Sequence, residues 1–520
     1  MLSAQSSRLE HAWQNVQLLV LSLLALPAAS ALTILSLLIR PLLSKSPQKH
    51  RNHVRSTRTP YLETKTILIT GVGMTKGLAL ARLFYAAGHH VIGADFESPY
   101  LPTTCGHLSK SLRAFYKLHK PDGSIDGSAR YGESLLNIIK KENVDLWVSC
   151  SGVASAVEDG RAKEMIELVT SCKAVQYGVT MTSVLHEKHT FFDFCRSIEL
   201  PVPETHNITS HAAAVKILTN PKKEGTKFIM KYTGTDDAFR ANMTLLPLST
   251  QEATKDYVLK FPISPSRPWI LQQFITGPEY CTHALIIRNT VVAFVACPSS
   301  ELLMHYVALP ADSILSNAML RFTQHFVESC PDDFTGHLSF DFLIDQEQAD
   351  AANRNAIKVS DVNLYPIECN PRAHTAVVLF SDTPEMISEG YMKIFDEPAS
   401  LSEDSHAHKA KTNGTKHVQP VMPRNPQKYY WLPHDLVTLV ILPVLGLLKT
   451  DGESFAEVLE KWSTFLEHLF TWRDGTFEIW DPMPALWLWC VSWPWIFVKA
   501  TVKGDKWSRI NVSTMKVFSC

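Results

Sequence analysis

The chain has almost no net charge and no closely spaced cysteines, and each absence excludes a class of protein. Its 520 residues carry 50 lysines and arginines against 51 aspartates and glutamates, a formal charge of −1. It therefore lacks the excess positive charge that attracts nucleic acid. The ten cysteines are scattered, without a Cys-x-x-Cys pair, and fit a reducing compartment better than a disulfide framework. The length allows two or three domains.

Charged residues are also missing from a long stretch near the N-terminus. The segment from Leu18 to Ile39 is uncharged and almost wholly apolar. At about 1.5 Å per residue it is long enough to cross the hydrocarbon core of a bilayer. Basic residues follow it: Arg40, Lys45, Lys49, Arg51, Arg55 and Arg58. Because basic flanks tend to stay in the cytosol, we predict a single-pass membrane anchor with the catalytic body on the cytosolic side.

Other interpretations of the apolar segments remain open. A cleaved signal peptide is disfavoured, because the basic residues lie on the far side of the first segment. A hairpin or interfacial helix kinked at Pro27 is the third interpretation. A tryptophan-rich stretch from Trp480 to Trp495 is typical either of a membrane interface or of a small helical cap on the body. Three prolines argue against a clean second span there: Pro482, Pro484 and Pro494.

A β-α-β pattern follows the basic connector. A buried strand from Thr66 leads into a glycine turn at Gly71 and Gly73, then a helix, then a second strand that ends at Asp95. Taken alone, this pattern suggests a dinucleotide site with Asp95 on a ribose. The spacing fails, however, since Lys76 occupies the place of the third glycine. A membrane-anchored NAD-dependent oxidoreductase is therefore kept as an alternative enzyme.

The composition and patterns divide the chain into five parts. We predict an anchor and connector over residues 1–63, a Rossmann-like α/β domain over 64–180 and a strand-rich α+β domain over 181–395. A flexible linker rich in polar residues is expected over 396–428, and a tryptophan-rich C-terminal cap over 429–520. The predicted fold class is therefore α/β plus α+β, with an N-terminal membrane helix.

Two apolar strands end in side chains that suit a metal-nucleotide site. One strand contains Asp341, and about thirty residues later the other ends in the motif from Glu368 to Arg372, which reads Glu-Cys-Asn-Pro-Arg. Mg²⁺ prefers hard oxygen ligands, usually one or two carboxylates together with phosphate oxygens. An adjacent arginine can neutralise the charge that develops as a phosphoryl group moves. The alternative is a pair of ordinary strand-end acids followed by a turn proline.

These residues are part of a series that resembles the ATP-grasp ligases. The series follows the order of that family: Lys188, Lys231, Gln272, Glu279, Asp341 and the Glu368 to Arg372 motif. Within the superfamily the chain is most similar to mycosporine-glycine synthase-type enzymes, through strings such as Met74-Thr75-Lys76, Cys281-Thr282-His283 and Asp481-Pro482. Strings outside the catalytic motif make this more than a likeness of fold. The resemblance implies an α/β domain followed by an ATP-grasp fold that grips ATP between two small subdomains.

The resemblance implies how ATP is bound. Lys188 and Lys231 look like the lysines that contact the phosphates, a task that suits a flexible point charge. Gln272 occupies the position that meets the adenine amino group, and its amide oxygen can accept that bond. Glu279 looks like the acid that binds the ribose hydroxyls. Two neighbouring residues would complete the adenine contacts through their backbone: Gln273 and Ile275.

The resemblance also implies the metal site and the chemistry. Asp341, Glu368 and Asn370 look like the ligands of Mg²⁺, with Mn²⁺ as a possible substitute. Arg372 and Lys231 are the candidate catalytic residues, and Arg372 would steady the γ-phosphate and the phosphorylated intermediate. The loop that follows Lys231 has a single glycine where many family members have several, and it is the candidate flap over the site.

The function implied is an ADP-forming carbon–nitrogen ligase. An acceptor oxygen, either carboxylate or enol, would be phosphorylated, and the amine of an amino acid would displace the phosphate. The expected partners are a small-molecule acceptor, an amino acid and a membrane, with no nucleic acid. Specialised (secondary) metabolism is the expected setting. A catalytically degenerate scaffold is the second alternative, although it predicts a lost metal ligand and all three positions are filled.

Overall fold

The computed structural model describes most of the chain. The described residues are 2, 5–42, 51, 63–150, 152, 155–220, 225–232, 244–299, 304–396, 419–447 and 452–520. Three of the predicted features lie wholly or largely outside them: the loop after Lys231, the basic connector and most of the expected linker.

A five-stranded parallel sheet forms the first α/β layer. Its order is β3-β2-β1-β4-β5, from β1 (Thr66–Thr70), β2 (His90–Phe96), β3 (Ala114–Leu118), β4 (Leu146–Val148) and β5 (Lys173–Val175). The β-α-β unit expected from the glycine turn is present. The strand order changes direction between β1 and β4, and doubly wound sheets bind ligands at such a point.

Helices cover both faces of this sheet, which explains why its strands are continuous apolar runs. The intervening helices are α3 (Thr75–Ala86), α4 (Ile125–Glu142) and α5 (Ala156–Val169). Successive residues of β1 point to opposite faces. Ile67 and Ile69 belong to the same core as Leu80 of α3, whereas Leu68 belongs to the core that contains Leu135 of α4.

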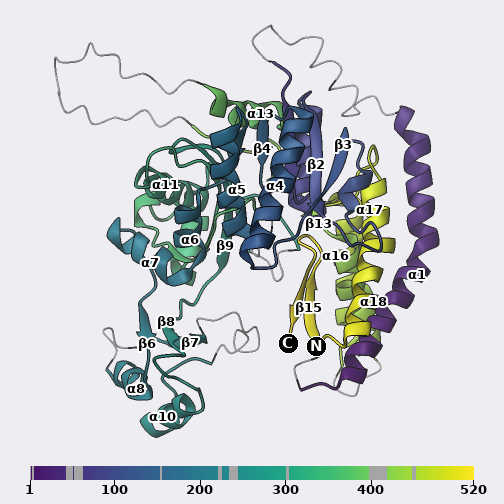
Figure 1. Ribbon diagram of the computed structural model, residues 1–520. Helices are drawn as coiled ribbons and strands as arrows, with labels where there is room; N and C mark the ends of the chain where they lie inside the picture. Colours follow the sequence, from purple (N-terminus) through teal and green to yellow (C-terminus); the bar gives the residue numbers. More distant parts are fainter. Residues whose placement is uncertain are drawn as a thin grey trace, which may run out of the picture.

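Two antiparallel sheets follow. The larger has the order β10-β9-β11-β12, from β9 (Glu279–Ile287), β10 (Thr290–Pro298), β11 (Gly336–Leu343) and β12 (Tyr365–Asn370). The smaller has the order β6-β8-β7, from β6 (Thr205–Ile208), β7 (Phe228–Tyr232) and β8 (Trp269–Gln273). Figure 1 shows the smaller sheet with α8 (His211–Thr219) and α10 (Gln251–Leu259) as a lobe below the main body.

Three helices accompany the larger sheet and its approach. α6 (Val179–His186) and α7 (Lys188–Ser197) precede the small lobe, and α11 (Ile314–Glu328) packs on β10. Phenylalanines fill the core between α7, α11 and β11: Phe191, Phe322, Phe326, Phe340 and Phe342. This packing fixes the ends of β11 and α7, which carry predicted site residues.

The N-terminal and C-terminal helices gather on one side of the molecule (Figure 1). They are α1 (Arg8–Ile39), α14 (Leu432–Asp435), α15 (Leu442–Gly446), α16 (Phe455–Thr471), α17 (Met483–Trp487) and α18 (Trp493–Lys503). Among the described residues, 8–42 and 483–503 form helices long and apolar enough to cross a membrane, judged by length and composition alone. The hairpin of β15 (Trp507–Asn511) and β16 (Lys516–Ser519) ends the chain.

The prolines do not interrupt the apolar helices. α1 runs without a break through Pro27, so the hairpin considered for this segment is not formed. Pro443 and Pro494 each come shortly after a π-helical turn, at Leu436–Ile441 and Leu488–Ser492. A wider turn accommodates the proline ring and its missing N–H. The second apolar segment is thus helical over Met483–Lys503, and the prediction that it does not span the membrane cleanly stays a prediction.

The C-terminal region is tied to the larger sheet. Val421 lies in the expected linker, yet its N–H donates to Val292 O at 2.9 Å and its carbonyl accepts from Phe294 N–H at 3.0 Å. This end of the linker is thus paired with β10. The buried Asp435 carboxylate accepts from His305 at 2.9 Å and from His468 at 2.7 Å, which joins α14 and α16 to the segment after β10.

Candidate functional site

Three carboxylates meet where β9, β11 and β12 lie side by side. Asp341 of β11 is the register partner of Glu368 on β12. Glu279 on β9 pairs with Leu343, two residues beyond Asp341 on β11. Since alternate residues of a strand share one face, Glu279 and Asp341 approach the same surface of the sheet. Asn370 Nδ2 donates to Asp341 Oδ2 at 3.3 Å, so all three predicted metal ligands are brought together.

The surroundings of Asp341 fit a divalent cation. Within the described residues no group donates a hydrogen bond to its buried Oδ1 atom. Burial raises the pKa of Asp341 to about 8, and the charges of Glu368 and Glu279 add to this effect. Carboxylates that repel one another in this way are stabilised when a cation binds between them. The donor set of two carboxylates and an amide matches the hard oxygen ligands of Mg²⁺.

Two lysines and an arginine face these carboxylates. Lys188 is the first residue of α7, and its Nζ lies 3.2 Å from Glu368 Oε2. Burial and the positive charge of Lys188 lower the pKa of Lys231 to about 8. Burial also lowers the pKa of Arg372, while the charges of Glu368 and Asp341 oppose that shift. Positive groups held close together in this way make a suitable site for an anion with several charges.

Two of the predicted adenine residues, Gln272 and Gln273, end β8 and have partners of their own, and Ile275 follows the strand. Lys231 Nζ donates to the amide oxygen of Gln272 at 2.7 Å, and the second lone pair of this oxygen leaves it able to accept from an adenine as well. Gln273 Oε1 accepts from Glu204 N–H at 3.1 Å, which fixes the end of β8 to the start of β6. Ile275 is buried.

The predicted ribose acid has a partner as well. Glu279 Oε1 accepts from the hydroxyl of Ser299 at 2.8 Å, and the N–H of Ser299 donates to the carbonyl of Glu279 at 2.8 Å. These two bonds hold the end of β10 beside the start of β9. The carboxylate keeps further acceptor capacity, because each carboxylate oxygen has two lone pairs.

One charged residue at this site was not predicted from the sequence to act here. Lys76 lies in the first turn of α3, at the carboxyl end of the parallel sheet, and only 3% of its surface is exposed. Burial lowers the pKa of Lys76 to about 7, and the positive charge of Arg372 contributes. The available signal was its position, since a lysine replaces the third glycine of a glycine-rich turn.

The same glycine turn holds the Asp95 carboxylate and brings α3 close to β1. Asp95 Oδ2 accepts from Gly73 N–H at 2.7 Å, and Asp95 Oδ1 accepts from Phe96 N–H at 2.7 Å. The carboxylate is thus directed at its own turn, and burial raises its pKa to about 6. A Cβ atom on Gly77 would lie 2.3 Å from Gly71 O, so the glycines serve the close approach of α3 to β1.

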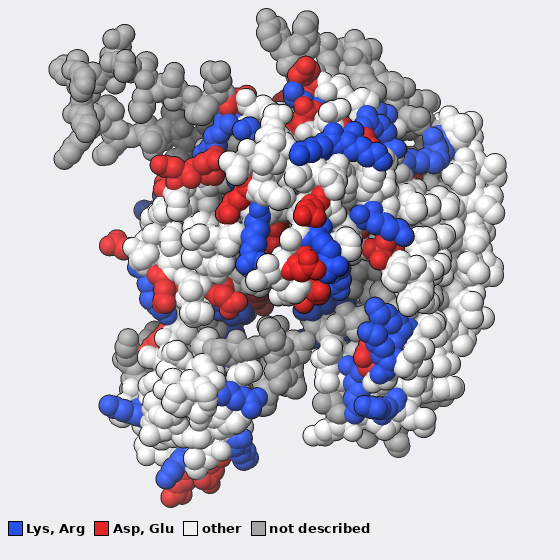
Figure 2. Space-filling model, in the orientation of Figure 1, with Lys and Arg blue, Asp and Glu red and all other residues white. Residues whose placement is uncertain are grey.

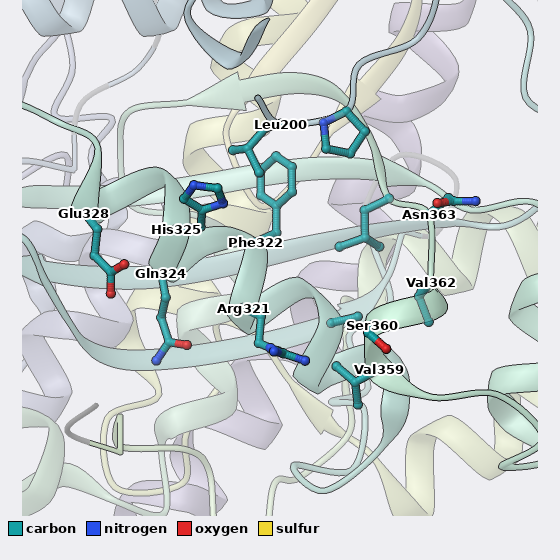
Figure 3. Close-up of a pocket in the computed structure, with 13 residues that line it drawn as sticks. Leu200, Arg321, Phe322, Gln324, His325, Glu328, Val359, Ser360, Val362 and Asn363 are labelled. Carbon is teal, nitrogen blue, oxygen red and sulfur yellow. The ribbon is translucent and has the colours of Figure 1, made fainter. Parts of the chain in front are cut away.

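A separate cavity lies away from these residues. It encloses about 470 Å³ beside α11 and the short helix Val359–Asp361, and Figure 3 shows side chains such as Arg321, Phe322 and His325 around it. None of the predicted site residues lines this cavity. The candidate site is therefore identified by the charged side chains that come together at it, and not by this cavity.

Comparison with known proteins gives likeness to solved structures alone. No family model matches the sequence, and no curated protein matches it. L-amino acid ligase from Bacillus licheniformis is 13% identical with a TM-score of 0.38, over 60% of this chain and 68% of that one. Phosphoribosylamine–glycine ligase from Thermotoga maritima is 11% identical with a TM-score of 0.41, over 70% and 78%.

A third similar structure is an ADP complex. It is N5-carboxyaminoimidazole ribonucleotide synthetase, 12% identical with a TM-score of 0.46, over 79% of this chain and 98% of that one. At these identities and TM-scores the likeness carries no argument about activity. The functional conclusion rests on the site's own residues.

Proposed function

We propose that this chain is an ATP- and Mg²⁺-dependent ligase of the ATP-grasp type that forms a carbon–nitrogen bond and releases ADP. The observation that carries the proposal is the convergence of three oxygen-bearing side chains and four cations on one site. The oxygen-bearing side chains are Asp341, Glu368 and Asn370, and the cations are Lys76, Lys188, Lys231 and Arg372. Oxygen ligands beside several cations match what a metal-bound triphosphate needs.

Asp341 and Glu368 would hold the metal, with the amide oxygen of Asn370 as a further donor. When bound, Mg²⁺ neutralises phosphate charge and orients the triphosphate. Mn²⁺ has the same preference for oxygen ligands and would substitute. Lys188 would move from Glu368 to a phosphate oxygen as the nucleotide enters. Lys231 would likewise move from Gln272 to a phosphate, and the amide oxygen of Gln272 would accept from the adenine.

The chemistry proposed has two steps. In the first, an oxygen of the acceptor attacks the γ-phosphorus of ATP, the bond to the bridging oxygen breaks and ADP leaves. In the second, the amine of an amino acid attacks the carbon that bears the new phosphate, phosphate departs with the bonding electrons, and the amine loses a proton. Arg372 would stabilise the charge on the transferred phosphoryl group in both steps.

The acceptor would bind where the parallel sheet meets the larger antiparallel sheet. Lys76 and Arg372 place two buried positive charges near each other, and an anionic acceptor would relieve their repulsion. The first turn of α3 is fixed there by a bond of 2.9 Å from Thr75 N–H to Ser513 O. Burial at this junction would exclude water, which would otherwise hydrolyse the phosphorylated acceptor.

A mycosporine-glycine synthase-type reaction is the form of this activity that we favour. It would join glycine or another amino acid to a small cyclic enol, in specialised metabolism and at a membrane. A carboxylate acceptor, which would give an amide, is the variant. The NAD-dependent alternative is disfavoured because Lys76 occupies the position where a dinucleotide-binding turn has its third glycine.

The test supplies the purified full-length protein in detergent with ATP, Mg²⁺ and pools of amino acids and acceptors. The acceptor pools separate cyclic enols from carboxylic acids. We expect ADP release that requires both an acceptor and an amine, with a coupled product detected by mass. Release of AMP would show that the acceptor is adenylated rather than phosphorylated, and would contradict the proposed first step. Nicotinamide-dependent turnover without ADP release would overturn the proposal.

A further inference from the structure

The polarity of α1 is the reverse of that of a helix on a water-soluble protein. Its buried residues are polar or small and recur at spacings of three, four and seven, which places them on one face. They are His11, Asn15, Ala29, Thr33 and Ser36. The hydroxyls of Thr33 and Ser36 donate to the helix's own carbonyls, at 2.8 and 2.7 Å.

The opposite face of α1 is apolar and exposed. No charged residue occurs between Glu10 and Arg40. Leu23 and Leu24 are 68% and 73% exposed, and other large apolar side chains continue this face: Leu9, Trp13, Val20, Ile34 and Leu38. Figure 2 shows this edge of the molecule as a long strip without charged side chains. A continuous apolar strip of this length indicates that the medium around it is not water.

The first half of α1 is fixed to the catalytic body by polar contacts. Lys506 Nζ donates to Ser6 O at 2.6 Å, and Trp507 Nε1 donates to the buried Asn15 Oδ1 at 2.9 Å. The β15–β16 hairpin that carries Trp507 reaches the parallel-sheet layer, where Ser513 O accepts from Thr75. This end of the helix therefore lies on the side of the body that carries the parallel sheet.

Further along, α1 packs on α17, and α17 is docked on the same body. Trp487 Nε1 donates to Pro102 O at 2.9 Å, and Ser492 Oγ donates to Thr103 O at 2.5 Å. Just before α17, buried Asp481 forms an ion pair with Arg82 of α3 at 3.0 Å. The helix pair of α1 and 483–503 is therefore attached to one body along its length, a geometry that a single membrane crossing does not allow.

A second helix on this side of the molecule also exposes an apolar face. Six large side chains of α16 are exposed at spacings of three, four and seven: Phe455, Leu459, Trp462, Leu466, Leu469 and Phe470. Glu457, Glu460 and Glu467 occupy other faces of the helix. An amphipathic helix with its apolar face unpartnered is typical of an interfacial segment.

We propose that α1 lies in the plane of a membrane, with its apolar face in one leaflet and both of its ends on the side of the catalytic body. This replaces the single crossing expected from the sequence. α1 is about 48 Å long, well above the roughly 30 Å of a hydrocarbon core, and an in-plane helix has no such limit. The body-facing polar stripe and the apolar strip both fit this orientation. The inference is independent of the ligase activity.

The first test asks on which side each end of α1 lies. In a Cys490→Ser, Cys520→Ser background, which removes the two half-exposed cysteines, single cysteines are placed by Gln5→Cys or Leu42→Cys. Sealed membrane vesicles from expressing cells are treated with a membrane-impermeant maleimide. We expect both ends to be labelled to the same extent before and after detergent, or both to be protected until detergent is added. Labelling of one end alone without detergent would establish a crossing and overturn the proposal.

The second test asks whether the apolar face is what holds the protein on the membrane. Leu24→Glu should move at least half of the protein from the membrane pellet to the soluble fraction. Leu168→Glu, on α5, is the matched control because Leu168 is 84% exposed on the parallel-sheet domain, and this variant should stay in the pellet. Equal thermal unfolding shows that both variants are folded. An unmodified protein that is soluble, as a monomer or as an oligomer of its own copies, would contradict membrane binding.

Discussion

Glu368 is the residue whose replacement tests the metal site most directly. It faces Asp341 across two strands and pairs with Lys188 at 3.2 Å, and its side chain is 42% exposed. Glu368→Gln keeps the shape of the side chain and removes one charge from the metal and phosphate site. We expect ADP release to fall at least about 100-fold, the usual order for loss of one charge-stabilising group. Coupled ADP detection at saturating Mg²⁺ measures the change.

The control for this variant is Glu389→Gln, on an exposed turn of α13 (Pro384–Met392). It should turn over like the unmodified protein. Because Glu368 is partly exposed, the thermal unfolding midpoint should shift little in either variant. A Glu368→Gln protein with near-normal turnover would show that this carboxylate does not hold the metal.

A substitution of Lys76 tests whether this residue binds the proposed acceptor rather than ATP. Lys76→Met removes a buried positive charge and keeps a side chain of similar length. We expect KM for the acceptor to rise about tenfold, the effect of losing one charge-assisted contact worth about 1.4 kcal/mol. KM for ATP should change less than twofold. Steady-state kinetics with each substrate varied in turn gives the two values.

Arg372→Lys is the comparison, because Arg372 lies near both the proposed metal ligands and Lys76. It keeps the charge and loses the planar fork, so it should lower kcat as well as binding. A Lys76→Met variant that weakened ATP and acceptor equally would place Lys76 on the nucleotide rather than on the acceptor.

For residues of a short motif, the sequence indicated which side chains lie close together. It did so less well for residues whose contacts depend on a distant part of the chain. Asp341 and Asn370 could be paired because one lies near the end of an apolar strand and the other ends the next, and the two groups lie 3.3 Å apart. The Lys231 to Gln272 bond had no local signal, because it joins β7 to β8 across forty residues of chain. In the sequence, Lys76 appeared only as the residue that replaces the third glycine of the turn. The structure shows that it is buried near the charge of Arg372.

At the scale of elements, two buried hydrogen bonds join α1 to β15: Trp507 N–H donates to His11 Nδ1 at 3.4 Å, and Trp507 Nε1 donates to Asn15 Oδ1 at 2.9 Å. Asn15→Ala removes the acceptor of Trp507 Nε1 and leaves a buried indole N–H without a partner. We expect a loss of about 1–3 kcal/mol in the free energy of unfolding. Denaturant unfolding in detergent micelles measures it. Gln17→Ala, at an exposed position two residues on, is the control and should change stability by less than about 0.5 kcal/mol.

The elements themselves could be predicted where their pattern is local. The strands of the parallel sheet and of the larger antiparallel sheet are short apolar runs bounded by turn residues. The association of α1 with residues 483–503 could not be predicted, because it joins segments more than four hundred residues apart. The π-helical turn ahead of Pro494 could not be predicted either, since it has no sequence signature of its own.

At the scale of the whole molecule, the junction between the sheets makes the fold sensitive to acid. His283 Nδ1 accepts from His374 N–H at 3.3 Å, and His374 Nδ1 accepts from Ala376 N–H at 3.3 Å. An imidazole nitrogen that accepts a hydrogen bond carries no proton, so both rings are neutral. Burial lowers the pKa of each to about 3, and the positive charge of Lys76 contributes.

The sign of the pH dependence follows from these values. Unfolded histidine titrates near pH 6.5, so acid favours the unfolded chain while the folded rings stay neutral. Stability is therefore full above about pH 6.5 and falls by about 1.4 kcal/mol per pH unit for each ring as the pH drops toward 3. His283→Asn keeps a hydrogen-bond acceptor and cannot be protonated. It should therefore reduce the slope of the unfolding free energy against pH by about 1.4 kcal/mol per pH unit. The exposed His119→Asn should leave the slope unchanged.

Urea unfolding at pH 7, 6 and 5 measures these slopes, and equal slopes for the His283→Asn and unmodified proteins would contradict the assignment. The loss of stability in acid has a structural origin. The parallel sheet brings Lys76, the larger sheet brings His283, and the segment after the metal motif brings His374 to one water-poor junction. The burial that would protect a phosphorylated acceptor from water also keeps these imidazoles neutral. Acid sensitivity and the proposed protection of the intermediate would thus be two consequences of one arrangement.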